Sequence, residues 1–308
     1  MGHAMSFAAG HPDFVRLKRR GVVQRADNLD DHARTVNSFE KSSRWFETPK
    51  MRVSLRPIFL NDFLMPAPAF TLPSPQTGTE YHVYVETAED APAAEPRATI
   101  LFLDGDDQFR PAVAAYQAAR AAGEVPPLRL VGVGYGASYT KPGNQRLRDY
   151  TPTALATEPE SGRADAFMAF LTETLWPELA RRHRVREDVR GLAGHSLGSL
   201  AVVHALFQRR PFFNRLLAST PSLWWDNRAI LCTAQNLQRT GVALPARLFL
   251  SVGEDDTPSM TGDLELLEDQ LNALPFPELE IISRRFPQRD HYNVLPDAFR
   301  AGLHALFG

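Results

Sequence analysis

The chain has 308 residues, of which 44% are hydrophobic and 23% charged, and its formal net charge is -2. This composition is typical of a folded protein and excludes a disordered or fibrous one. No apolar run reaches the roughly 18 residues that a membrane-spanning helix needs. Cys232 is the only cysteine, so neither an intrachain disulfide nor a cysteine-based metal site can form. We therefore expect a cytoplasmic protein with no membrane partner and no metal.

The beginning of the chain is basic and has no clear period. Its first 60 residues carry 11 Lys and Arg against six Asp and Glu. The basic residues are interleaved with acids such as Asp27, Asp30 and Asp31, so they form no sustained cationic block and predict no nucleic-acid partner. We expect residues 1–65 to be an irregular extension that packs on a main domain of residues 66–308. The oligomeric state stays open.

A proline-rich stretch and then a regular alternation of elements follow. Residues 66–79, with four prolines, predict irregular loop, and Tyr81, Val83 and Val85 then alternate with polar residues as in a half-buried strand. Apolar runs typical of buried parallel strands come next, at residues 99–103, 128–133, 189–193, 215–219, 247–252 and 279–286. Helical stretches separate them, near residues 111–122, 163–182, 197–209, 229–239, 263–273 and 297–307. Residues 143–162 form a long loop.

This alternation predicts the fold class and the place of the site. Strands joined by helices favour a doubly wound, mostly parallel sheet with helices on both faces. In such α/β folds the functional site lies outside the carboxyl ends of the strands. The residues that directly follow each predicted strand are therefore the candidates for chemistry.

One such junction carries a nucleophile motif. Gly194-His195-Ser196-Leu197-Gly198 lies between a predicted strand and a predicted helix. Gly-x-Ser-x-Gly in that context is the nucleophile elbow, in which two glycines allow a tight turn that lifts the serine hydroxyl above the sheet. We expect Ser196 to be a nucleophile, and the alternative is a glycine-rich turn with an idle serine.

A serine nucleophile needs a general base and an acid that orients it. In the α/β-hydrolase arrangement the chain order is Ser, acid, His. His291, after the last predicted strand, is the expected base. Asp256, three residues after Gly253, is the expected acid, although Glu254 and Asp255 are adjacent and equally acidic. A site with Ser196 and His291 alone remains an alternative.

Acyl transfer also needs hydrogen-bond donors for the developing oxyanion. The first expected donor is the backbone N–H of Leu197, at the start of the helix. The second comes from the loop after residues 99–103, where Gly105 permits a close approach of the backbone. We expect the N–H of Asp106 to serve there, and the alternative is that this loop is a simple turn.

Several segments together resemble a known family. They are Leu103-Asp104-Gly105-Asp106, Val131-Gly132-Val133-Gly134-Tyr135, Arg146-Leu147-Arg148-Asp149-Tyr150-Thr151-Pro152, residues 194–200, and Pro221-Ser222-Leu223-Trp224-Trp225. Within about residues 70–305 the chain resembles the esterase D-like branch of the α/β-hydrolases, and in particular bacterial siderophore esterases that open the trilactone of enterobactin-type compounds. The resemblance implies a serine esterase without a cofactor, with Ser196 as nucleophile and His291 as base.

Four further residues are candidates for substrate binding. Trp224 and Trp225 follow a predicted strand at the edge that carries Ser196, so at least one can offer an aromatic wall, although adjacent tryptophans also serve as core wedges. Arg146 and Arg148 lie in the long loop and can bind an anionic substrate. A solvated pair, or a structural bridge to Asp149, is the alternative for them.

The sequence therefore predicts an enzyme that acts on a small-molecule ester through an acyl-serine intermediate. A siderophore ester is the favoured substrate. The alternatives are another esterase of the same branch, acting on a carbohydrate acyl ester, an aryl ester or S-formylglutathione, and a binding protein that keeps the fold without catalysis.

Overall fold

The computed structural model describes residues 15–16, 67–87 and 95–308. These residues contain a nine-stranded sheet with the order β1-β9-β8-β7-β6-β4-β5-β3-β2. The six strands from β4 to β9 run parallel, and β1, β2 and β3 are antiparallel to their neighbours. The strands are β1 (Val15–Arg16), β2 (Phe70–Pro73), β3 (Glu80–Thr87), β4 (Arg97–Phe102), β5 (Arg129–Gly134), β6 (Val185–His195), β7 (Arg215–Ser219), β8 (Ala246–Gly253) and β9 (Leu279–Phe286).

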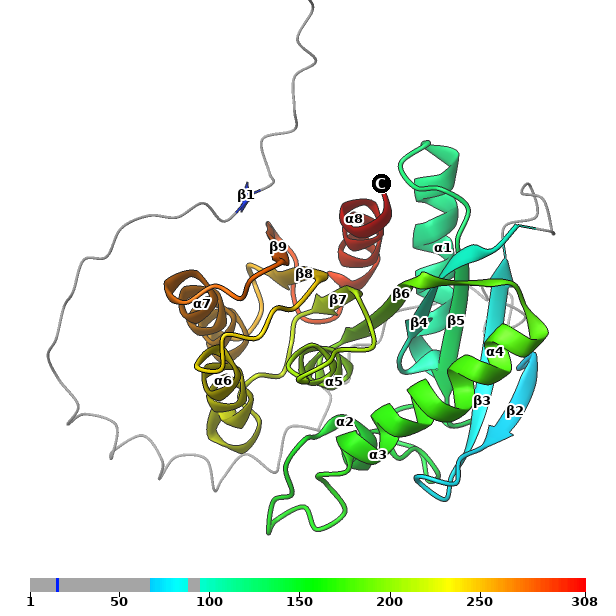
Figure 1. The fold of residues 1–308 in the computed structure, drawn as a ribbon, viewed down its shortest axis with the longest axis horizontal. Helices are drawn as coiled ribbons and strands as arrows, with labels where there is room; N and C mark the ends of the chain where they lie inside the picture. Colours follow the sequence, from blue (N-terminus) through cyan, green and yellow to red (C-terminus); the bar gives the residue numbers. More distant parts are fainter. Residues whose placement is uncertain (1–14, 17–66, 88–94) are drawn as a thin grey trace, which may run out of the picture. The chain divides into compact units, whose positions relative to one another are not determined.

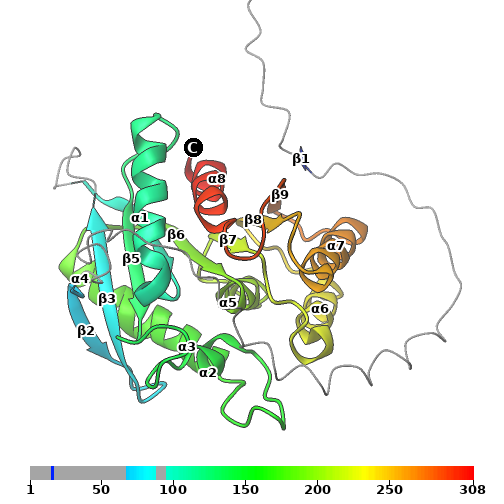
Figure 2. The same ribbon diagram turned by 180° about the vertical axis from the view of Figure 1, so that it is seen from behind.

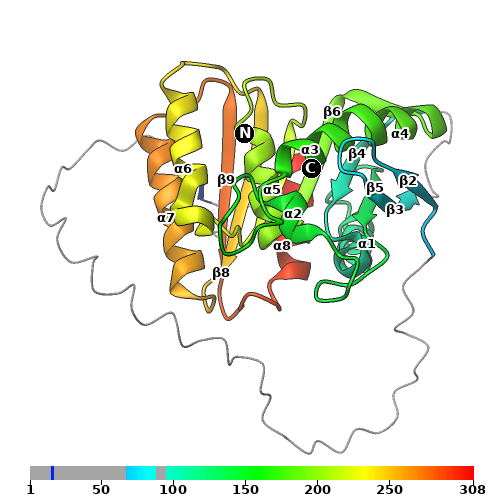
Figure 3. The same ribbon diagram turned by 90° about the horizontal axis from the view of Figure 1, so that it is seen from below.

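Helices cover both faces of the sheet. They are α1 (Gly105–Ala121), α2 (Arg146–Tyr150), α3 (Ala164–Ala169), the π-helical η4 (Phe170–Leu175), α4 (Trp176–Arg182), α5 (Leu197–Leu206), α6 (Trp225–Gln238), α7 (Pro258–Ala273) and α8 (Leu295–Phe307). α1 and α8 lie side by side on one face (Figures 1 and 2), and α6 and α7 lie together beside β8 and β9 (Figure 3). The predicted fold class, a mostly parallel sheet between helices, is confirmed.

Strand β4 shows how the sheet divides the core into two layers. Because successive side chains of a strand point to opposite faces, Ile100 and Phe102 belong to the core layer of α1 and α8, and Leu101 belongs to the other layer, which includes α3, α5 and α7. Burial on both faces explains the apolar run from Ile100 to Phe102, which follows the buried polar residues Arg97 and Thr99. All six residues of β4 are buried.

Some boundaries differ from those expected. β7 and β9 coincide with the predicted strands, but α1 begins at Gly105 and not at Pro111, which lies inside the helix. The expected loop of residues 66–79 contains β2, because an edge strand tolerates a proline such as Pro73. The long loop of residues 143–162 contains the short helix α2.

Two predicted helices are also irregular. The helix expected over residues 163–182 is interrupted by η4 between α3 and α4. α6 begins at Trp225, four residues before the expected Ala229, and Asp226, Asn227 and Arg228 have left-handed backbone angles. The expected extension, residues 1–65, lies outside the described residues except for 15–16. In the part of the chain that the structure describes, no helix is long and apolar enough to cross a membrane.

Candidate active site

Ser196 lies on a strained turn between β6 and α5. Its φ of 57° and ψ of -121° place it outside the regions that residues with a side chain prefer. A Cβ added at Gly194 would lie 2.5 Å from the backbone of Gly198, so only glycine fits there. The Ser199 hydroxyl, 2.7 Å from the carbonyl oxygens of both Gly194 and Ser219, ties the turn to β7. These contacts form the elbow that the motif predicts.

The structure brings Ser196, His291 and Asp256 together, with His291 in contact with both of the others. His291 Nε2 lies 3.0 Å from Ser196 Oγ, and His291 Nδ1 lies 3.0 Å from Asp256 Oδ2. The three residues come from the carboxyl ends of β6, β9 and β8, which the parallel sheet places at one edge. This geometry suits a serine whose proton passes to a histidine that a carboxylate orients.

The loop after β8 distinguishes the three adjacent acids. Glu254 and Asp255 are exposed, whereas Asp256 is 9% exposed and faces His291. A Cβ at Gly253 would lie 2.1 Å from the carbonyl oxygen of Arg289, so the loop that carries His291 packs directly on this glycine. The N–H of Thr257 donates to Asp256 Oδ1, 2.6 Å away, which fixes the carboxylate.

The two expected oxyanion donors both begin helices. Leu197 is the first residue of α5 and Asp106 the second of α1, where backbone N–H groups have no partner inside the helix. The close approach at Gly105 is toward the backbone of Val133 in β5, because an added Cβ would lie 2.8 Å from its nitrogen. The Asp106 carboxylate accepts hydrogen bonds from the Tyr84 hydroxyl and from two N–H groups after β5. Its side chain therefore anchors α1 to the sheet.

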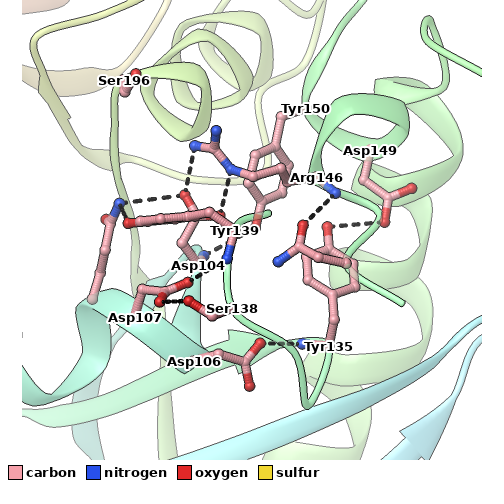
Figure 4. Close-up of polar contacts among 12 residues, drawn as sticks. Asp104, Asp106, Asp107, Tyr135, Ser138, Tyr139, Arg146, Asp149, Tyr150 and Ser196 are labelled. Carbon is pink, nitrogen blue, oxygen red and sulfur yellow. Dashed lines mark hydrogen bonds and ion pairs between the residues drawn. The ribbon is translucent and has the colours of Figure 1, made fainter. Parts of the chain in front are cut away.

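Arg146 forms a closed ion pair beside the elbow. Its Nε and Nη2 bond the two carboxylate oxygens of Asp104 at 2.9 and 3.0 Å (Figure 4). Asp104 is buried, and one of its oxygens would lie 3.2 Å from a Cβ added at Gly198, so the pair packs on the start of α5. Burial raises the pKa of Asp104, and the Arg146 guanidinium opposes that rise. No role was predicted for Asp104, although it stands in the same loop as Asp106.

Arg148 has a different set of partners. Its guanidinium bonds both oxygens of the buried Asp149, at 2.7 and 3.1 Å, and the Thr79 hydroxyl. The hydroxyls of Tyr81 and Tyr135 also donate to Asp149. These contacts favour the structural bridge for Arg148, and they fasten α2 to β3.

The two adjacent tryptophans also differ. Trp225 is 4% exposed and its Nε1 donates to the carbonyl oxygen of Thr153, 3.0 Å away, so it is a core wedge that holds the long loop. Trp224 is 44% exposed. Ser222, two residues earlier, places its hydroxyl 3.5 Å from Ser196 Oγ. Trp224 is therefore the member of the pair that is open to solvent, and it lies two residues along the chain from the Ser222 hydroxyl.

His195, which received no role from the sequence beyond its place in the motif, lies behind the site. It is buried, its Nδ1 is 3.2 Å from the Ser219 hydroxyl, and its ring centroid is 4.9 Å from that of His291. Burial lowers its pKa to about 3, and electrostatic interactions with His291 and Arg146 lower it in the same direction. His195 is therefore neutral wherever the protein is folded near neutral pH.

Comparisons with known proteins agree with this geometry. Residues 74–269 match a family model described as "Putative esterase". The chain is 27% identical over 275 residues to the ferri-bacillibactin esterase BesA of Bacillus subtilis, covering 77% of this chain and 92% of that protein. It is 32% identical over 170 residues to a siderophore triacetylfusarinine C esterase of Aspergillus fumigatus, covering 54% of each.

Solved structures are similar as well. The BES protein from Bacillus cereus superposes with a TM-score of 0.70 at 25% identity, over 78% of this chain and 94% of that one. An IroE-like serine hydrolase from Shewanella oneidensis has a TM-score of 0.68 at 23% identity, over 77% and 79% of the two chains, and shows the same fold. These comparisons confirm the predicted α/β-hydrolase fold and the predicted enzyme class, a carboxylic ester hydrolase. Because the family model spans most of the sheet and includes Ser196 and Asp256, the chain belongs to this esterase family.

Proposed function

We propose that this protein is a serine esterase that hydrolyses the trilactone esters of siderophores through an acyl-Ser196 intermediate. The observation that carries the proposal is the line of two 3.0 Å contacts from Asp256 through His291 to Ser196. The names of the relatives, which include a ferri-bacillibactin esterase and a siderophore triacetylfusarinine C esterase, support the substrate class.

The reaction follows from the positions of the three side chains. Ser196 Oγ attacks the ester carbonyl carbon while His291 Nε2 takes its proton, and the same proton then passes to the departing alkoxide as the ester C–O bond breaks. His291 next takes a proton from water as the water oxygen attacks the acyl carbon. The bond from that carbon to Ser196 Oγ then breaks while His291 returns the proton to Oγ, and the acid product leaves. Asp256 holds the Nδ1–H of His291, so that Nε2 faces the serine and the imidazolium is stabilised.

We assign the oxyanion to the backbone N–H groups of Leu197 and Asp106. Donors at the starts of two helices meet the developing negative charge with the positive ends of the helix dipoles. The hydrogen bonds that the Asp106 carboxylate accepts hold its own backbone in place before substrate arrives. Such a preorganised donor needs no rearrangement during the reaction.

Of the four expected substrate contacts, we assign the direct ones to Arg146 and Trp224. Arg146 uses Nε and Nη2 for Asp104, and among the described residues no group bonds its Nη1, so this nitrogen can donate to an anionic substrate. Its side chain is 20% exposed. Arg148 and Trp225 support these contacts through Asp149 and Thr153.

The presence of a single cysteine supports a cytoplasmic location.

A turnover panel tests the substrate class. The purified protein is assayed with apo and ferric trilactone siderophores, p-nitrophenyl esters, acetylated sugars and S-formylglutathione. We expect the highest kcat/KM for a trilactone. A preference for acetylated sugars or S-formylglutathione would replace the siderophore with one of the other substrates of this branch. No turnover, together with no labelling of Ser196 by a fluorophosphonate, would favour a binding protein.

A further inference from the structure

Exposed aromatic side chains are concentrated at the edge of the sheet that carries Ser196. Among the described residues, five large hydrophobic side chains are exposed. Two of them, Leu266 and Leu274, belong to α7 and the residue after it. The other three are aromatic, and they are Tyr139 at 39%, Trp224 at 44% and Tyr292 at 84% exposure. These three follow β5, β7 and β9, each at the carboxyl end of a parallel strand.

Each of the three rings adjoins a group of the proposed site. The Tyr292 ring stands edge-on to the His291 imidazole, with centroids 5.4 Å apart and an interplanar angle of 86°. The Arg146 guanidinium lies 4.8 Å from the centroid of the Tyr139 ring, which Figure 4 shows beside the Asp104 pair. Trp224 is connected to the Ser196 turn through the chain segment that begins at Ser222. The N–H of Ser222 donates to the carbonyl oxygen of Ser196.

Two of the rings are also held in place. Gln108 Nε2 donates to the Tyr139 hydroxyl at 2.5 Å, and Trp224 packs at 6.0 Å from the Trp225 ring, which is itself buried. An exposed ring that the fold already orients can bind another ring at a small cost in side-chain entropy. Exposed aromatic groups gathered in one place typically mark a binding surface.

We propose that Tyr139, Trp224 and Tyr292 form an aromatic rim around Ser196 that binds aryl groups carried on the arms of the ester substrate. The proposal rests on the proposed function and adds a specificity that the triad does not supply. Aromatic pairs are favourable in edge-to-face and offset-stacked arrangements. Three rings on three different loops suit a substrate with several aryl groups better than an ester with one. The rim therefore selects aryl over alkyl arms at equal ester chemistry.

The experiment uses two serine trilactones that differ only in their arms, one N-benzoylated and the other N-acetylated. Both carry the same ester bonds and no charge, so their ratio of kcat/KM isolates the contribution of the aryl groups. We expect Tyr292→Ala, Trp224→Ala and Tyr139→Ala each to lower the benzoyl-to-acetyl ratio by about two- to tenfold. Tyr292→Phe keeps the ring and should keep the ratio. Leu266→Ala, which removes an exposed side chain on α7, is the matched control.

A ratio that stays constant in all three alanine variants would overturn the rim, and so would an equal fall in Leu266→Ala. Failure of the proposed function has a different signature. If the wild type hydrolyses neither trilactone, binding is measured as protection of Ser196 from a fluorophosphonate. Protection by the benzoyl compound that weakens in the alanine variants would support the rim and contradict the trilactone reaction, whereas no protection would overturn both.

Discussion

The two halves of the site differ in how their polar and charged side chains are paired. The half with the proposed triad, called the triad side here, consists of Ser196, His291 and Asp256, and contacts of 3.0 Å join Asp256 to His291 and His291 to Ser196. The arginine side consists of Asp104 and Arg146, which face each other through two bonds and form a closed, neutral pair. A chain of single hydrogen bonds can move a proton, whereas a bidentate ion pair fixes a geometry. Under the proposed function, chemistry and substrate positioning would therefore belong to separate halves.

The largest expected effect is on the triad side. Ser196→Ala should lower kcat/KM by about 10⁴- to 10⁶-fold and abolish fluorophosphonate labelling, because the remaining groups only bind substrate and stabilise the oxyanion. Intact-mass spectrometry measures the labelling. Ser222→Ala is the control, since its hydroxyl lies 3.5 Å from Ser196 Oγ and should not be needed for labelling. Stoichiometric labelling of Ser196→Ala would overturn the assignment of the nucleophile.

The next effect concerns the acid. Asp256→Asn should lower kcat by about 10⁴-fold, because the carboxylate fixes the His291 tautomer and stabilises the imidazolium. Steady-state kinetics on any ester that the wild type hydrolyses measures it. Glu254→Gln and Asp255→Asn are matched controls on exposed neighbours and should change kcat little. If all three variants were fully active, the site would be a Ser-His dyad.

The lowered pKa of His195 predicts a pH dependence of stability. Its pKa of about 3 in the folded protein lies below the usual 6.5, so the unfolded chain binds an extra proton between these values. Stability from this group is therefore complete above about pH 6.5 and falls as the pH drops toward 3, by up to about 1.4 kcal/mol per pH unit. Urea unfolding between pH 4.5 and 7 measures the slope. His195→Gln should flatten it, and an unchanged slope would contradict the prediction.

The smallest expected effect concerns the ion pair between Arg146 and Asp104. Asp104→Asn leaves the charge of Arg146 unbalanced, so the KM of an anionic siderophore should fall by about two- to fivefold. Added salt should raise this KM again, because it screens the unbalanced charge. Asparagine suits this position because Asp104 has a φ of 53°. Arg146→Ala should raise the same KM. A neutral acetyl ester is the control substrate, and equal changes on both substrates would make the pair purely structural.

Much of the architecture follows from local sequence patterns. The strands β7 and β9 have the bounds that their sequence patterns predict. In β7 the apolar residues Leu216 to Ala218 are buried, as in a strand covered on both faces. β9 is mostly half-buried and includes polar residues such as Glu280 and Arg284. The elbow around Ser196 is also local, since two glycines and a serine at a strand-to-helix junction fit few other structures. The predicted start of α1 at Pro111 was wrong. A proline often marks the first turn of a helix, whereas Pro111 lies inside this one.

By itself the sequence determined the alternation of elements, the elbow and the loops that supply His291 and an acid. Only the tertiary structure decided which of three adjacent acids meets His291, which tryptophan is buried, and that Arg146 pairs with Asp104 while Arg148 pairs with Asp149. The physical reason is that these choices depend on which way neighbouring side chains point across the gaps between loops. A loop has no regular side-chain period of the kind that a strand or a helix has, so the sequence pattern does not record which of its neighbouring side chains faces the site.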